Sequence, residues 1–290
     1  MAVDTMRPIG PAGPDPDMSM GHELMELERR ARLIHALQVS VVWIVLFLIL
    51  GLALMLLNFD PQYVRDHIGF VFQGLLVTIQ LALISIAIAT VLALLGALGR
   101  LSTNAIAQGV SGFYISLFRG TPLLIQIYLI YLGLPQIGQQ LTIMGFPQIG
   151  QMFTLTAFQS GVLALSLNYG AYMTEIFRAG IQSISYGQRE AASAIGMNRL
   201  QIMRRVILPQ AVRIIIPDIG NQFIAMQKDT ALVSVMGIWE LTFRANRLAR
   251  QESKFMEMFV AAALMYWVLT VVSAYLESRI ERNLAHAYER

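Results

Sequence analysis

Six long apolar segments limit the possible folds of this chain more strictly than any other feature. They cover residues 41–57, 70–99, 110–133, 153–174, 214–235 and 258–276. A membrane-spanning helix needs about 20 mainly apolar residues, and these runs lack the alternating pattern of barrel strands. Since lipid offers the backbone no hydrogen bonds, we expect an all-α integral membrane protein with six spanning helices.

The composition excludes several classes of function. Hydrophobic residues make up 56% of the 290 residues and charged residues 13%, which is unusual for a soluble domain. The chain has no cysteine, and its four histidines are scattered without the spacing of metal ligands. We therefore expect contact with membrane lipid, and no disulfide, thiol chemistry, metal site or nucleic acid partner.

The two ends of the chain differ from its middle in composition. Four prolines and few apolar residues predict disorder in residues 1–20. Residues 21–40 have the pattern of an amphipathic cytoplasmic helix that leads into the first span, residues 41–57. We expect residues 283–290 to form a C-terminal tail.

Charge sets the expected orientation of the spans, because cytoplasmic loops carry an excess of Lys and Arg. With both termini in the cytoplasm, 14 of the 21 basic residues lie on that side, 5 lie outside and 2 lie within spans. The loop 241–254 is the exception, since it places four basic residues outside. Two interpretations stay open: late loops affect topology weakly, or this loop docks an extracytoplasmic partner.

One polar island, residues 187–211, separates the fourth and fifth spans. Its sequence is GQREAASAIGMNRLQIMRRVILPQA. Its first part favours a helix, Gly196 permits a turn, and Asn198 can cap a second helix that Pro209 is expected to end. The alternatives are a hairpin that packs only on its own bundle and one that docks a soluble partner. The residues expected to contact such a partner are Glu190, Ala191, Ala192, Gly196 and Arg199.

Polar residues inside spans are candidates for a transport pathway, because their burial in lipid is costly. In the fifth span, polar residues at i, i+3, i+4 and i+11 share one helix face with a small residue at i+7. This stripe consists of Asp218, Asn221, Gln222, Ala225 and Asp229. A weaker stripe in the fourth span consists of Asn168, Tyr172 and Glu175, of which Glu175 is expected to pair with Arg178. The residues Arg119, Gly120, Thr121 and Pro122 break the third apolar run, and such breaks often line substrate sites.

Several segments together carry a resemblance to a known family. They are GLLVTIQLAL (74–83), LFRGTPLLIQ (117–126), LNYGAYMTEIFRAGIQSI (167–184), GQREAASAIGM (187–197), VILPQAVR (206–213) and KDTALVSV (228–235). The chain resembles permeases of the polar amino acid uptake family, which are type I ABC importers, over residues 67–282. Departures from the family pattern are Val206 for isoleucine, Ala231 for serine, and Ser185-Tyr186 for a pair containing proline or lysine.

The resemblance implies a five-helix permease core with one additional N-terminal helix, in the cytoplasmic (inner) membrane of a bacterium. Its partners would be a separate ATP-binding cassette ATPase, a periplasmic or lipid-anchored solute-binding protein, and a second permease chain, identical or similar. No phosphate-binding G-x4-G-K-[ST] motif occurs in the sequence, so ATP and Mg²⁺ would bind the ATPase and this chain would not be an enzyme.

The resemblance also suggests what the charged residues in the spans bind. Arg119 would hold the carboxylate of an amino acid and Asp229 its ammonium group, with Thr121, Asn221 and Gln222 completing the substrate site. Alternatively, Asp229 forms a structural ion pair with Arg119 or with Lys228. A competing class of function is an ion-coupled secondary amino acid transporter that uses a buried Asp229. A further class, a membrane-embedded enzyme, has no support because the sequence shows no nucleophile–base pair.

The orientation predicts which loops are accessible from each side of the membrane. Because the chain has no cysteine, single cysteines can be introduced without removing others. A cysteine at Ser193 should react with an impermeant maleimide only in inverted vesicles, and one at Gln251 only in intact cells. Labelling of position 193 in intact cells would reject both the orientation and the cytoplasmic docking role.

Overall fold

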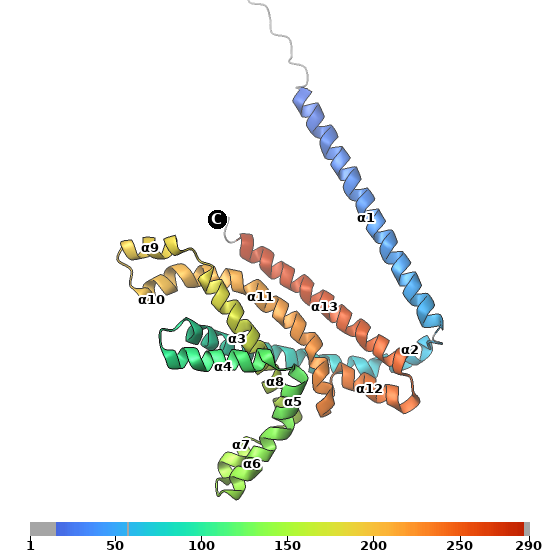
Figure 1. Cartoon of the computed structure of the whole chain (residues 1–290). Helices are drawn as coiled ribbons and strands as arrows, with labels where there is room; N and C mark the ends of the chain where they lie inside the picture. Colours follow the sequence, from blue (N-terminus) through green and yellow to red (C-terminus); the bar gives the residue numbers. More distant parts are fainter. Residues whose placement is uncertain (1–15, 57, 287–290) are drawn as a thin grey trace, which may run out of the picture. The chain divides into compact units, whose positions relative to one another are not determined.

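The structure is a computed structural model that describes residues 16–56 and 58–286. All regular secondary structure in these residues is helical, which confirms the all-α expectation. The chain forms two compact units, residues 1–59 and 60–290. Figure 1 shows the elements in the order in which they follow along the chain.

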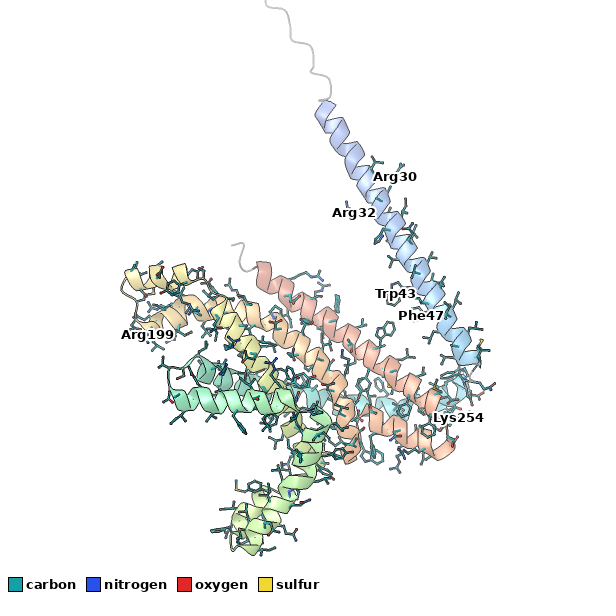
Figure 2. All side chains as sticks on the ribbon, viewed as in Figure 1. Arg30, Arg32, Trp43, Phe47, Arg199 and Lys254 are labelled. Atoms are coloured by element: carbon teal, nitrogen blue, oxygen red, sulfur yellow. The ribbon has the colours of Figure 1, made fainter. Side chains whose placement is uncertain are left out.

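The first unit is built on one long helix, α1, Pro16–Leu56. The sequence predicts a lead-in helix and a separate span, but α1 runs through both without a break. It begins at Pro16, within the segment for which the sequence predicts disorder; residues 1–15 lie outside the described residues. Basic Arg30 and Arg32 occupy its first half and the contacting rings of Trp43 and Phe47 its apolar second half (Figure 2).

The second unit contains the remaining helices. They are α2 (Pro61–Phe72), α3 (Gly74–Leu101), α4 (Ala105–Gly120), α5 (Leu123–Tyr128), the π-helix η1 (Leu129–Gly133), α6 (Leu134–Ile143), α7 (Pro147–Met152), α8 (Ala157–Gln182), α9 (Tyr186–Ala194), α10 (Arg199–Ile202), the π-helix η2 (Met203–Ile207), α11 (Leu208–Asp229), the 3₁₀ helix η3 (Thr230–Met236), α12 (Leu241–Glu252) and α13 (Phe255–His286).

Three helices in the described residues are long and apolar enough to cross a membrane: α1, α3 and α13. A fourth span arises if α4 and the helical segment 123–143, which meet at 108°, count as one. Helices α8 and α11, with 26 and 22 residues, are long enough to cross but more polar. Their polarity is expected of helices that pack against other helices or a water-filled path rather than lipid.

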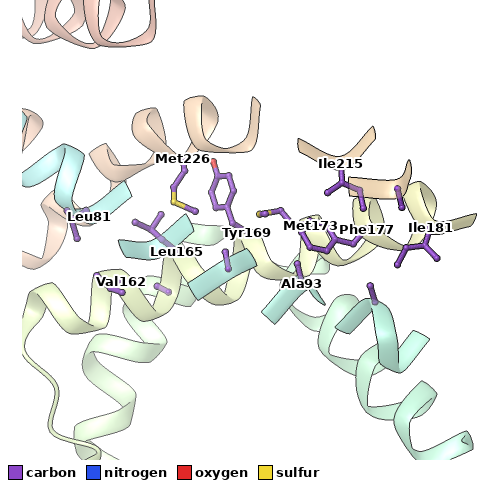
Figure 3. Close-up of a cluster of buried hydrophobic side chains, with 14 of the residues drawn as sticks. Leu81, Ala93, Val162, Leu165, Tyr169, Met173, Phe177, Ile181, Ile215 and Met226 are labelled. Atoms are coloured by element: carbon purple, nitrogen blue, oxygen red, sulfur yellow. The ribbon is translucent and has the colours of Figure 1, made fainter. Parts of the chain in front are cut away.

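The core of the second unit lies where α3, α8 and α11 meet. Small residues on α3, such as Ala89 and Ala93, are fully buried and let the helices approach closely. Figure 3 shows Met173 and Phe177 of α8 beside Ile215 of α11, within the same buried cluster. These contacts fix α8 between its neighbours, and α8 carries much of the candidate site.

A second cluster joins α2, α12 and the start of α13. Asp60 caps α2, and the backbone N–H of Tyr63 and the Lys254 ammonium lower the pKa of its carboxyl group. Glu240 caps α12 by accepting bonds from the backbone of Thr242 and Phe243, and burial raises its pKa to about 7. These caps anchor α12 and α2 to the bundle.

Candidate functional site

The first component of the site is the break between α4 and α5. Helix α4 ends at Gly120, Thr121 and Pro122 are extended, and the chain continues at an angle of 108°. This confirms the break that the Gly-Thr-Pro sequence predicts. It also leaves the carbonyl groups at the end of α4 without helical partners, which is costly in a membrane.

Two buried amides satisfy those carbonyl groups. The Nε2 of Gln126 lies 2.8 Å from the Phe118 carbonyl oxygen, 3.0 Å from that of Thr121 and 2.8 Å from the Thr121 hydroxyl. The Nδ2 of Asn168 on α8 donates to Gln126 Oε1 at 3.0 Å and to the Phe118 carbonyl at 3.2 Å. The break is therefore locked onto α8 by side chains from two helices. Sequence reasoning missed Gln126, although a polar residue four positions after Pro122 was a usable signal.

The second component is the carboxylate of Asp229 at the end of α11. The Tyr169 hydroxyl of α8 donates to Asp229 Oδ2 at 2.8 Å. In Figure 3 the Tyr169 ring points from α8 toward α11, beside Met226. Within residues 58–286, Asp229 forms no ion pair with Arg119 or with Lys228. Its hydrogen-bond partner is thus neutral, and its negative charge is not cancelled by a neighbouring cation.

The third component is Arg119, the last residue but one of α4. Its guanidinium lies over the ring of Tyr172, 5.2 Å from the centroid, and the side chain is exposed. Tyr172 and Tyr169 are three residues apart on α8 and so lie on neighbouring positions of its surface. Helix α8 therefore carries an aromatic residue against each of the two charged groups, Tyr172 at the Arg119 guanidinium and Tyr169 at the Asp229 carboxylate.

The other residues expected at the substrate site have different surroundings. The Thr121 hydroxyl donates to the Leu117 carbonyl and accepts from Gln126, so its role is structural at the break. Exposed Asn221 and half-buried Gln222 precede Asp229 on α11 by eight and seven residues. Seven or eight residues of α-helix span about 11 Å. The structure therefore places the two amides about two turns of α11 away from Asp229.

The hairpin α9–α10 is the other candidate interaction surface. Gly196 has φ = +83°, a conformation that L-residues with a Cβ rarely adopt, although no atom lies within 4 Å of an added Cβ. Asn198 and Gln201 form a capping box at 2.9 Å in both directions. The turn and the cap that the sequence predicts are both confirmed.

Two details of the hairpin differ from the sequence prediction. Pro209 does not end the second helix; the helical backbone continues through η2 into α11, where Pro209 occupies the first turn. A π-helical turn accommodates the missing N–H because its hydrogen-bond pattern is already shifted. Ala192 is 5% exposed and packs in the chain's own core, so it does not form a flat outer face with exposed Ala191.

The outer surface of the hairpin combines charge with uncovered apolar side chains. Glu190 and Arg199 are exposed and form no ion pair within the described part of the chain. Tyr186, Ile195 and Leu200 are 73%, 73% and 76% exposed. Figure 2 labels Arg199 on the part of the hairpin that projects from the bundle. Exposed apolar side chains among charges are typical of protein interaction surfaces. Sequence reasoning did not assign these three residues to such a surface.

Comparison with protein families agrees with this arrangement. The family model described as "Binding-protein-dependent transport system inner membrane component" matches residues 89–286, which include the break, the Asp229 region and the hairpin. The chain belongs to this family. Its members and relatives include ABC transporter permeases, so the resemblance stated from the sequence is confirmed.

Relatives with curated names cover most of this ABC transporter permease. The probable amino-acid permease protein YxeN of Bacillus subtilis (strain 168) is 38% identical over 79% of this chain and 97% of its own length. The arginine transport system permease protein ArtQ of the same organism is 36% identical over 79% and 98%. The octopine transport system permease protein OccM of Rhizobium radiobacter is 38% identical over 77% and 89%.

Solved structures share the fold. A crystal structure of an amino acid ABC transporter with histidines aligns with a TM-score of 0.68 and 36% identity, over 77% of this chain and 98% of that one. An inward-facing structure of the MetNI methionine ABC transporter aligns at 17% identity with a TM-score of 0.60, over 76% and 98%. The five-helix permease architecture expected from the sequence is thereby confirmed.

The amide network at the break predicts a specific stability effect. In Gln126→Leu the Thr121 carbonyl loses its side-chain donor and Asn168 loses its acceptor Oε1, while the Phe118 carbonyl keeps only its bond from Asn168. An unsatisfied buried polar group costs about 1–3 kcal/mol. The thermal midpoint of the purified permease in detergent should fall. The matched control is Gln140→Leu, the same change at an exposed position of α6. Equal midpoints for the two variants would contradict a structural role for Gln126.

Proposed function

We propose that this chain is the permease subunit of an ATP-driven importer for polar amino acids or their close relatives in the bacterial inner membrane. It receives substrate from a periplasmic or lipid-anchored solute-binding protein and is coupled to a separate ATPase through α9–α10. The observation that carries this proposal is the hairpin: its exposed charged and apolar side chains suit a protein partner. The names of the curated relatives supply the substrate class.

The proposal assigns the hairpin residues separate roles. Glu190 and Arg199 offer charges of opposite sign to the ATPase, and Ala191 allows close approach beside them. Gly196 and the Asn198 capping box hold the two short helices at a fixed angle. Since α10 continues through η2 into α11, the ATPase would act on a helix that ends at Asp229. ATP and Mg²⁺ would be bound by that partner.

The orientation follows from the same assignment. With the hairpin in the cytoplasm, the N- and C-termini also lie there, and α12 faces the solute-binding protein at the opposite end of α11. A second permease chain, a copy of this one or a similar one, would cover the exposed polar stripe that includes Asp218 and Asn221. Its presence would turn that exposed face into the wall of a pathway.

Within the pathway, we assign the substrate's carboxylate to Arg119 and its ammonium to Asp229. Tyr172 and Tyr169 of α8 orient these two groups without neutralising them. Neutral partners leave both charges available to a zwitterion, whereas an internal ion pair would have to break before substrate bound. This geometry favours the substrate site over the structural ion pair.

The turn at Gly196 provides a test of coupling with a matched control. Gly196→Ala and Gly187→Ala each add one methyl group with no atom within 4 Å, but only position 196 has a positive φ. A left-handed conformation costs an L-residue roughly 1–2 kcal/mol. In proteoliposomes with the ATPase and the binding protein, Gly196→Ala should reduce substrate-stimulated ATP hydrolysis and uptake, and Gly187→Ala should not. Uptake that proceeds without ATP would instead support the ion-coupled class.

The charged pair predicts the effect of neutralising each member. Loss of one charge-assisted contact of about 1.5–3 kcal/mol in Arg119→Gln or Asp229→Asn should weaken apparent affinity in uptake by ~10- to 150-fold. Folded yield and copurification of the ATPase should match those of Lys228→Gln, a control at the exposed neighbouring cation. Low yield of each single variant, with yield and uptake restored in the double variant, would show that the pair is structural.

A further inference from the structure

A polar cavity lies at the end of α11 opposite to the hairpin. It has a volume of about 560 Å³ and is walled by α5, η3 and α12. Arg247, Arg250 and Asn246 of α12 line one side, with Ser234 of η3 and Tyr128 of α5 across from them. No role in the proposed substrate pair or the hairpin accounts for this cavity.

The cavity is cationic. No carboxylate lines it, and neither Arg247 nor Arg250 forms an ion pair anywhere in residues 58–286. Arg247 lies over the ring of Trp239 at 4.7 Å, and the Nε of Arg250 donates to Asn246 Oδ1 at 3.0 Å. These neutral contacts orient both guanidinium groups and leave their charge uncancelled. Two such groups one helical turn apart suit a carboxylate, which an arginine binds with paired N–H donors.

The other two walls connect the cavity to the proposed substrate pair. Helix α5 follows directly after the break that carries Arg119, and η3 begins directly after Asp229. Ser234 is five residues beyond Asp229, which is about 10 Å along a 3₁₀ helix. The cavity therefore lies along both elements that hold the pair, on the side away from the hairpin.

We propose that this cavity is an entry site that binds the α-carboxylate of the substrate amino acid before Arg119 and Asp229 receive it. The inference rests on the proposed function, since it needs amino acids as substrates. The α-carboxylate is common to all of them, so the site would select the class and not the side chain. A concave cavity with three walls and hydroxyl, amide and guanidinium groups fits a small molecule better than a flat protein surface.

Trp239 offers a direct readout, because its ring lies against Arg247. The full chain in nanodiscs, without the ATPase, would carry Trp43→Phe and Trp267→Phe so that Trp239 is the sole remaining tryptophan of three. L-glutamine and L-arginine should each change its fluorescence saturably. Their methyl esters, which lack the carboxylate charge, should bind at least about 10-fold more weakly. Equal affinity for acid and ester would overturn the proposal.

Variants locate the binding event. Arg250→Gln should raise the apparent Kd about 10-fold or more, and Arg250→Lys should recover part of the loss. The matched control is Arg244→Gln: Arg244 also lies over Trp239, at 5.3 Å, but it bonds the Phe70 carbonyl and Gln73 outside the cavity. Its removal should leave the Kd within about twofold. Equal losses in the two variants would overturn the proposal.

Further measurements distinguish a failure of the entry site from a failure of the proposed importer function. A Trp239 response that survives in Asp229→Asn, while the apparent affinity in uptake falls, supports an entry site distinct from the Arg119 and Asp229 pair. A response that disappears in Asp229→Asn but persists in Arg250→Gln would place binding at Arg119 and Asp229. That result would overturn the entry site and leave the proposed importer function unchanged. A response to purified solute-binding protein, with none to free amino acids, would make the cavity a protein-docking site and also overturn the proposal.

Discussion

The arrangement of this permease depends on one requirement: a helix broken inside a membrane must have its freed backbone groups satisfied by protein. The break at residues 119–122 would otherwise expose carbonyl groups to lipid. Gln126 and Asn168 supply the donors, and Asn168 belongs to a different helix. The bond network therefore determines where α5 leaves α4, and with it where Arg119 stands relative to α8.

Helix α8 is the element that brings the site together. Three of its residues within five positions each contact a different part: Asn168 the break, Tyr169 the Asp229 carboxylate, and Tyr172 the Arg119 guanidinium. Because α8 is fixed by burial against α3, the spacing of the two aromatic contacts is set by the surface of one helix. A loop-borne site would need additional contacts to hold the same spacing.

The sequence predicted those features that depend on local rules and failed on those set by distant contacts. The break at Gly120–Pro122, the turn at Gly196 and the cap at Asn198 follow from backbone chemistry, and all are present. The role assigned to Pro209 was wrong, because a proline in the first turn of a helix is tolerated when the preceding turn is π-helical. The partner of Asp229 was not predictable: Tyr169 lies 60 residues away, and no spacing rule connects them.

The continuity of the backbone past Pro209 changes how the two candidate surfaces relate. From Arg199 to Met236 every residue is α-, π- or 3₁₀-helical, so no loop separates the hairpin from Asp229 or from the η3 wall of the polar cavity. A helix without a loop bends only where its hydrogen bonds are disturbed. In this stretch those places are η2, Pro217 inside α11 and the change to 3₁₀ geometry after Asp229. One of these places adjoins the hairpin and another adjoins the Asp229 carboxylate. A displacement at α10 therefore has a short, defined set of positions where it can be absorbed before it reaches Asp229.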